Sequence, residues 1–228
     1  MRRSSRIAVA LQRPEDVIPH LGKPSHWKHG RSAKSLADSW FFAGDIPAAI
    51  RALLAQSDYL AGAELLEAWL ERETDLQDGR ATPSQTDLLA LLGIGEKLAV
   101  LGIEAKVDES FGPVVSKWLG SGSDGKLRRL AQLCTLFQLN PAHVGHLRYQ
   151  LFHRTAAAIL EARRFRCDAA ILIVQSFCPR STGLSDATAF FDAIGMYGLA
   201  TGKLSGVRRF DGIDLWVGWA HDSIRVDD

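Results

Sequence analysis

Residues 169–174, Ala169-Ala170-Ile171-Leu172-Ile173-Val174, are apolar at every position. Successive side chains of a β-strand point to opposite faces of the sheet, so a strand that is apolar throughout needs cover on both faces. Helices packed on each side of a central strand provide that cover. The stretch therefore predicts an α/β domain with a central strand at this place.

The residues before this strand predict a crossover helix. Asn140-Pro141 is a favourable pair of N-cap and first-turn residues, and an apolar stripe with helical spacing follows it over residues 144–162. Cations in residues 163–166 suit the end of a helix, where the helix dipole favours positive charge. We therefore expect one long helix from residue 140 to about residue 164, directly before the central strand.

Upstream, two apolar segments cover Thr86 to Leu92 and Leu98 to Val107. Their lengths and the short glycine-containing connection at residues 93–97 predict a β-hairpin. The segment from Glu64 to Leu76 fits helical and strand periodicity about equally well, and we interpret it as a first strand. The sequence thus predicts three successive strands before the long helix.

The remaining periodic segments predict flanking helices and a last strand. They are a helix near Ser32, a short helix after Pro47, an amphipathic helix over residues 127–137, a helix from Ser185 to Tyr197 and a strand from Gly212 to Ala220. Residues 1–30 are rich in Pro, His and Lys and have no long periodicity. We expect an irregular N-terminal arm over residues 1–30 and a single domain over residues 31–228.

The composition is that of an ordinary globular protein, with 228 residues, 46% of them hydrophobic and 23% charged. The formal net charge is only +1, so a surface for a polyanion must be a local patch. The three cysteines have no CxxC spacing, which favours a reducing cytoplasm over a disulfide framework. No stretch approaches the roughly 18 apolar residues of a membrane span. We expect a cytoplasmic protein without a membrane partner.

The second hairpin strand ends in Glu104-Ala105-Lys106. Side chains two residues apart on a strand share a face, so Glu104 and Lys106 project together. Asp87 lies near the start of the preceding strand, and antiparallel pairing can bring it beside Glu104. Two carboxylates and one ammonium group are therefore predicted to converge.

This combination of residue types suits metal-assisted hydrolysis of a phosphodiester. Two carboxylates offer the hard oxygen ligands that Mg²⁺ or Mn²⁺ prefers, and such a metal ion can activate water and polarise a phosphate. Lys106 would position the attacking water and offset charge in the transition state. The same tripeptide also fits a plain ion pair between Glu104 and Lys106 at the edge of a sheet.

The order helix, three strands, helix, strand, together with these motifs, resembles the PD-(D/E)xK (restriction-endonuclease-like) nuclease superfamily. The resemblance covers about residues 30 to 220 and looks closest to an uncharacterised bacterial family placed in that fold. It rests on Pro83-Ser84-Gln85-Thr86-Asp87, on Glu104-Ala105-Lys106-Val107-Asp108-Glu109-Ser110-Phe111-Gly112-Pro113 and on Leu147-Arg148-Tyr149-Gln150-Leu151-Phe152-His153-Arg154-Thr155. It implies a mixed αβββαβ sheet flanked by helices, with an N-terminal helical extension. It also implies that Asp87 and Glu104 are metal ligands and Lys106 the catalytic lysine.

Members of this superfamily often add a polar residue from the helix after the motif strand. Gln150 and Arg154 are four residues apart, so they share a helix face that could look into the site. Some members also supply a glutamate upstream of the first strand, for which Glu64 and Glu67 are guesses. A more distant candidate for phosphate contact is the group Lys126, Arg128 and Arg129.

The sequence thus predicts a metal-dependent nuclease that acts on nucleic acid, with DNA the preferred interpretation and Mg²⁺ or Mn²⁺ as cofactor. A homodimer would let two such sites address both strands of a duplex. The alternative is a nuclease-fold module that binds DNA or a protein partner without cutting, because a fold does not fix a function.

Overall fold

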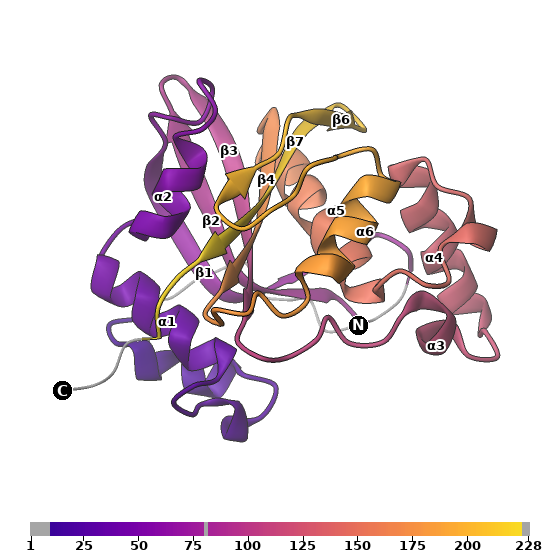
Figure 1. The fold of residues 1–228 in the computed structure, drawn as a ribbon, viewed down its shortest axis with the longest axis horizontal. Coiled ribbons are helices and arrows are strands. Elements are labelled where there is room, and N and C mark those ends of the chain that lie inside the picture. Colours follow the sequence, from indigo (N-terminus) through magenta and orange to yellow (C-terminus); the bar gives the residue numbers. More distant parts are fainter. Residues whose placement is uncertain (1–9, 80–81, 225–228) are drawn as a thin grey trace.

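The strand expected at residues 169–174 lies at the centre of a seven-stranded mixed sheet (Figure 1). This computed structural model describes residues 10–79 and 82–224. Every residue of the central strand is buried, which agrees with its apolar sequence. The strands are β1 (Glu64–Thr74), β2 (Ser84–Ile94), β3 (Lys97–Lys106), β4 (Ala169–Ser176), β5 (Lys203–Leu204), β6 (Arg208–Phe210) and β7 (Ile213–His221).

The sheet has the order β1-β2-β3-β4-β7-β5, and β6 pairs with β7. Strands β1, β2 and β3 form an antiparallel meander, whereas β4 is parallel to both β3 and β7. The ambiguous segment after Glu64 is therefore a strand, as expected. A crossover through helices connects β3 to β4, which a parallel pair requires.

Helices cover both faces of the sheet (Figure 1). They are α1 (Ser32–Ala43), α2 (Ala48–Leu54), α3 (Val115–Leu119), α4 (Asp124–Phe137), α5 (Tyr149–Arg164) and α6 (Leu184–Ala193). The first two pack with one face of the strands, and α4, α5 and α6 pack with the other. The α/β class and the N-terminal helical layer are thus confirmed.

The long crossover helix begins later than the sequence indicates. Asn140 does cap a turn, because its side chain accepts a hydrogen bond from the Ala142 N–H, but the turn is a short 3-10 helix, η3 (Pro141–His143). The backbone carbonyls of Gly145 and Leu147 then accept hydrogen bonds from residues 115–116. Those carbonyls are not free to form a helix ladder, so α5 starts only at Tyr149.

The last helix also departs from its predicted bounds. It starts at Leu184 after Gly183, whose φ of +91° only glycine adopts easily, and not at a Ser185 or Asp186 cap. It ends at Ala193 instead of Tyr197, because Gly195 turns the chain at a φ of +73°.

The described part of the N-terminal arm, residues 10–30, is more ordered than the sequence indicates, and residues 1–9 of the expected arm lie outside the described residues. Two short 3-10 helices, η1 (Pro14–His20) and η2 (Pro24–His26), form there. Val17 and Leu21 are buried against Ala37 of α1, so these turns pack on the domain. Their buried apolar residues are irregularly spaced, so no sequence periodicity predicts these two short helices.

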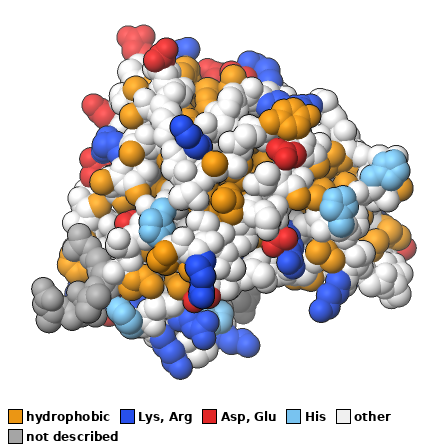
Figure 2. Space-filling model, viewed as in Figure 1, with side chains coloured by type: hydrophobic (Ala, Val, Ile, Leu, Met, Phe, Trp, Pro, Cys, Tyr) orange, Lys and Arg blue, Asp and Glu red, His pale blue; other side chains and the backbone are white. Residues whose placement is uncertain are grey.

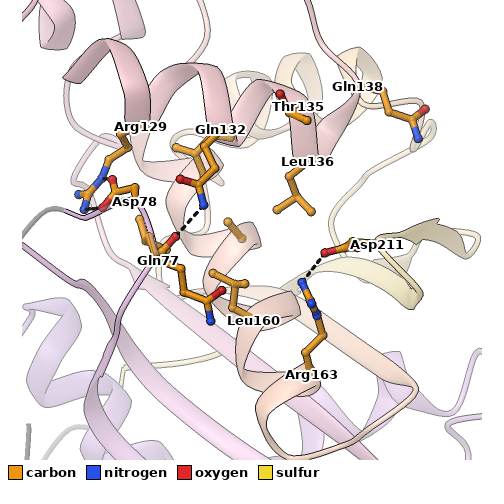
Figure 3. Close-up of a pocket in the computed structure, with 13 residues that line it drawn as sticks. Gln77, Asp78, Arg129, Gln132, Thr135, Leu136, Gln138, Leu160, Arg163 and Asp211 are labelled. Carbon is orange, nitrogen blue, oxygen red and sulfur yellow. Dashed lines mark hydrogen bonds and ion pairs between the residues drawn. The ribbon is translucent and has the colours of Figure 1, made fainter. Parts of the chain in front are cut away.

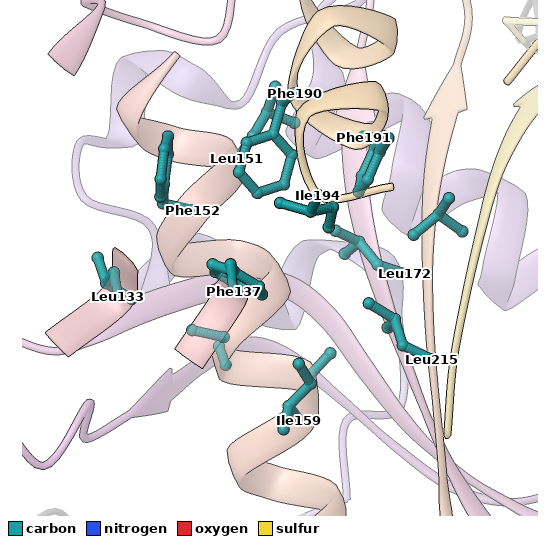
Figure 4. Close-up of a cluster of buried hydrophobic side chains, with 14 of the residues drawn as sticks. Leu133, Phe137, Leu151, Phe152, Ile159, Leu172, Phe190, Phe191, Ile194 and Leu215 are labelled. Atoms are coloured by element: carbon teal, nitrogen blue, oxygen red, sulfur yellow. The ribbon is translucent and has the colours of Figure 1, made fainter. Parts of the chain in front are cut away.

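The larger apolar core lies between the sheet and helices α4, α5 and α6 (Figure 4). Phe137, at the end of α4, is 1% exposed and contacts the rings of Phe152 and Phe190 edge-on. It also contacts Phe210 of β6 in the same manner. One side chain therefore joins two other helices and a strand.

We predict that Phe137→Ala destabilises the protein by about 3–5 kcal/mol, because it removes this buried ring and leaves a cavity. Urea unfolding measures the change. Leu127→Ala is the matched control, because Leu127 lies on the same helix but is 48% exposed. It should cost less than about 0.5 kcal/mol. Similar losses in the two variants would contradict the packing described for this core.

Candidate active site

Three carboxylates stand in a row across neighbouring strands. The pairs Leu70 with Leu88 and Arg72 with Thr86 place Glu71 of β1 opposite Asp87 of β2. In the next strand pair, Leu88 of β2 lies opposite Ile103 of β3. Because the strands are antiparallel, the preceding residue of β2, Asp87, lies opposite the following residue of β3, Glu104. The sheet register thus brings together the two predicted acids and adds a third.

Glu104 is the most tightly held member of the row. It is 1% exposed, and its Oε1 accepts hydrogen bonds from Lys106 Nζ at 2.6 Å and from Gln150 Nε2 at 2.7 Å. Arg154 Nε donates to Oε2 of the same carboxylate. Burial works to raise the pKa of Glu104, but Arg154 and Lys106 together lower it to about 2. Glu104 therefore stays ionised.

Lys106 is buried, and this corrects one sequence-based interpretation. The alternative to catalysis was an exposed ion pair at a sheet edge, yet both partners are almost fully enclosed. The Lys106 ammonium lies 4.9 Å from the centre of the Phe111 ring and 3.3 Å from Gln150 Oε1. The lysine is thus held in one orientation, beside the carboxylate of Glu104.

The negative charge of Asp87 is less fully offset by neighbouring groups than that of Glu104. Its Oδ2 accepts a hydrogen bond from the Ala105 N–H at 2.8 Å, and its Oδ1 lies 3.5 Å from Arg154 Nη2. The side chain is 21% exposed, so it can be reached from solvent. Burial and the charge of Glu104 raise the pKa of Asp87 to about 6, against the opposing effects of Arg154 and Lys106. The one Arg154 guanidinium spans both predicted metal ligands.

Glu71 is the acid that the sequence analysis missed. Burial raises its pKa to about 8, and the nearby charge of Asp87 adds to the effect. Glu64 and Glu67, the two earlier guesses, are exposed and lie toward the other end of β1. One sequence signal could have identified Glu71. The turn residues around Gly79 predict a hairpin, and in a hairpin centred on Gly79 the residues eight positions before and after it, Glu71 and Asp87, pair across the strands.

Helix α5 contributes from the opposite side. Gln150 and Arg154 both reach Glu104, as the four-residue spacing suggested. His153 points elsewhere: its Nδ1 lies 2.9 Å from the Ser84 hydroxyl, and burial lowers its pKa to about 3. Ser84 also accepts from Arg154 Nη1 at 3.3 Å. His153 is thus a neutral neighbour that helps to fix the start of β2.

Of the more distant phosphate candidates, only Arg128 is exposed. Lys126 donates to the backbone carbonyl of Trp118, and Arg129 is buried in an ion pair with Asp78. The three cations are close together in the sequence, but the sequence does not reveal that two of them, Lys126 and Arg129, make contacts that stabilise the fold. They do not form the expected patch.

A pocket of about 480 Å³ lies between α4, α5 and the loop after β1 (Figure 3). Its apolar wall includes Leu136 and Leu160, and its two arginines, Arg129 and Arg163, are paired with aspartates. None of the clustered acids lines it. The pocket is therefore separate from the candidate active site.

The donor set suits a hard divalent cation in part. Three carboxylates face two cationic side chains, and the pKa values of Asp87 and Glu71 are raised first by burial and then by the charge of a neighbouring carboxylate. Within residues 10–79 and 82–224, however, no three His, Cys, Asp or Glu side chains are placed to hold a metal ion together. Arg154 already spans Asp87 and Glu104, so a metal ion shared by these two requires the guanidinium to shift.

Residues 10–224 match the model of the family described as "Domain of unknown function (DUF6946)". No curated protein and no solved structure matches the chain. None of the helices described is long and apolar enough to cross a membrane.

We predict that the stability of the metal-free protein falls as pH rises, in part because of Glu71. A raised carboxyl pKa means that the folded state binds the proton more tightly, so this contribution is complete below about pH 4.5 and is lost as pH passes about 8. Glu71→Gln should flatten that decline, measured by urea unfolding with a chelator between about pH 5 and pH 8. Glu73→Gln, on the same strand but exposed, should not. An equal decline in the Glu71 variant would refute the assignment.

Proposed function

The chain belongs to this family, and we propose that its buried acid cluster is the active site of a metal-dependent nuclease acting on DNA. The observation that carries the proposal is the row of Glu71, Asp87 and Glu104 with the Lys106 ammonium beside it. An acidic cluster that merely stabilised the fold would be expected to balance its charges. Here two carboxyl groups have raised pKa values, which is common where enzymes bind cations or move protons.

The arrangement of the core supports a restriction-endonuclease-like fold. The chain runs from helices α1 and α2 through the β1-β2-β3 meander and α5 to β4, which pairs in parallel with β3. This is the αβββαβ order on which the resemblance to PD-(D/E)xK nucleases rests. The order also explains why Glu104 and Lys106, at the end of β3, face Gln150 and Arg154 on α5.

Each residue has a role in this proposal. Asp87 and Glu104 would hold Mg²⁺ or Mn²⁺, which when bound supplies a Lewis acid for the scissile phosphate. Lys106 orients the attacking water and donates a hydrogen bond to charge that develops in the transition state. Gln150 fixes the orientation of the Lys106 and Glu104 side chains, because it accepts a hydrogen bond from Lys106 and donates one to Glu104. Arg154, once released from Asp87, is a cation available to a phosphate oxygen.

A second candidate function is a nuclease-fold module that binds without cutting. The contacts of Arg154 favour it, because this side chain pairs with Glu104 and spans to Asp87 where a metal ion would bind. In that case the cluster is a closed ion network that fixes α5 against the sheet. The two functions differ in their response to divalent cations and in cleavage.

We predict that Mg²⁺ or Mn²⁺ raises the melting temperature at neutral pH. A cation that binds only the folded state stabilises it by about 2.7 kcal/mol at a hundred times its Kd. Asp87→Asn should abolish the response, because it removes a ligand charge at nearly constant shape. Glu67→Gln, an exposed acid on β1, should keep it. A metal shift that survives in the Asp87 variant would mean that the ions bind elsewhere.

We predict that Lys106→Met lowers metal-dependent DNA cleavage by about 10²–10³-fold while DNA binding is retained. The range is that for loss of a single donor to the transition state. Methionine keeps apolar contact with Phe111, and Arg154 still pairs with Glu104, so the variant should fold. Cleavage of plasmid and single-stranded DNA with Mn²⁺ measures the change, and circular dichroism checks the fold. Lys117→Met, an exposed change on α3, is the control. Full cleavage by the Lys106 variant would contradict the proposed role.

A further inference from the structure

One stretch of the surface carries positive charge without any acid. Between Asp16 and Asp38 the sequence has no aspartate or glutamate. The stretch contains three lysines, one arginine and three histidines. Six of these seven side chains are exposed, and we call them the N-terminal basic surface: His20, Lys23, His26, Lys28, His29 and Arg31.

The basic surface is built on a fixed framework. Val17 and Leu21 are buried against Ala37, and Trp27 packs on the same small cluster. The seventh cation, Lys34, reaches over the Trp27 ring and pairs with Asp38 at 2.7 Å. The exposed cations are therefore presented from anchored turns, which lowers the entropy lost when they bind a ligand.

The lysines and the arginine of this surface have no ion-pair partner among the residues that the structure describes. Some exposed arginines elsewhere are paired: Arg51 lies 2.7 Å from Asp45, and Arg209 lies 3.1 Å from Asp214. Lys23, Lys28 and Arg31 have no such acid. Their charge is thus available to a partner from outside the chain.

The surface borders the acid cluster. The backbone carbonyl of His20 accepts a hydrogen bond from Gln85, two residues before Asp87 on β2. On the other side, Ser32, next to Arg31, lies near Glu109, three residues after Lys106: burial works to raise the pKa of Glu109, and Ser32 lowers it. Figure 2 shows Lys and Arg side chains gathered at the lower edge of the molecule, where the N-terminal segment lies in Figure 1.

We propose that the N-terminal basic surface binds the phosphate backbone of the DNA and holds it across the end of the sheet that carries the acid cluster. The inference rests on the proposed function, because it names where the substrate of that site lies. Phosphate contacts from lysine and arginine fix the position of a duplex without reading its sequence. They also supply attraction where the acid cluster itself, rich in carboxylates, repels DNA.

The test compares two triple variants of the full chain. Lys23→Gln, Lys28→Gln and Arg31→Gln together remove the unpaired cations of the surface. Lys97→Gln, Arg166→Gln and Arg209→Gln together remove three exposed cations at the opposite end of the sheet, with the same change in net charge. Binding of a short fluorescein-labelled DNA duplex is measured by anisotropy with a chelator, which prevents metal-dependent cleavage. The salt concentration is varied at about pH 8, where free histidines are neutral.

The first variant should bind more weakly and lower the slope of log K against log salt by up to about three, near one counterion per lost phosphate contact. The control variant should keep the slope of the wild type. Equal slopes in all three proteins, or a wild type that binds no duplex, would overturn the proposal. Cleavage is scored separately with Mn²⁺. A lower salt slope in the first variant, together with no cleavage by the wild type, would support DNA binding by the basic surface and refute the nuclease proposal. Cleavage by the wild type with an unchanged slope in the first variant would support the nuclease proposal and refute DNA binding by this surface.

Discussion

The buried charge of Glu104 is the constraint on which the arrangement of sheet and helix depends. Removing a carboxylate from water costs several kcal/mol unless partners replace the lost hydration. Lys106 supplies one partner from the same strand, and Gln150 and Arg154 supply two from α5. The helix must therefore sit at one height and one rotation on β3, so the interaction that forms the site also positions the crossover.

The same constraint distributes charge unequally within the row of acids. Glu104 takes the closest contacts of both cations, which leaves Asp87 with a single distant guanidinium and one backbone N–H. Glu71 lies on the outer strand, and its burial, together with the charge of Asp87, raises its pKa to about 8. Stability and function pull in opposite directions here, because an acid kept short of partners weakens the fold but remains able to take a cation or a proton.

Much of this could be predicted from the sequence, because the deciding patterns are local. The apolar residues of β4, the hairpin of β2 and β3, and the shared face of Glu104 and Lys106 follow from alternation along a strand. The start of α5 could not be predicted, since the carbonyls of Gly145 and Leu147, just before it, accept hydrogen bonds from a distant segment. Glu71 was hidden for a related reason: its φ of +53° breaks the alternation that would have assigned it to a face. The first miss arises where tertiary contacts override a local pattern, and the second where the backbone of one residue departs from the strand conformation.

A net charge of +1 conceals a strong separation of charge. Cations without acids occupy the turns before α1, and acids that exceed their cations occupy the adjoining end of β1, β2 and β3. These regions meet through Gln85 and Glu109, so the field between them changes sign over a short distance. A polyanion drawn to the basic side would meet the acids at their border, and a divalent cation would be drawn to the acids. Such a gradient needs no excess charge on the molecule, so a local basic surface is compatible with a net charge of +1.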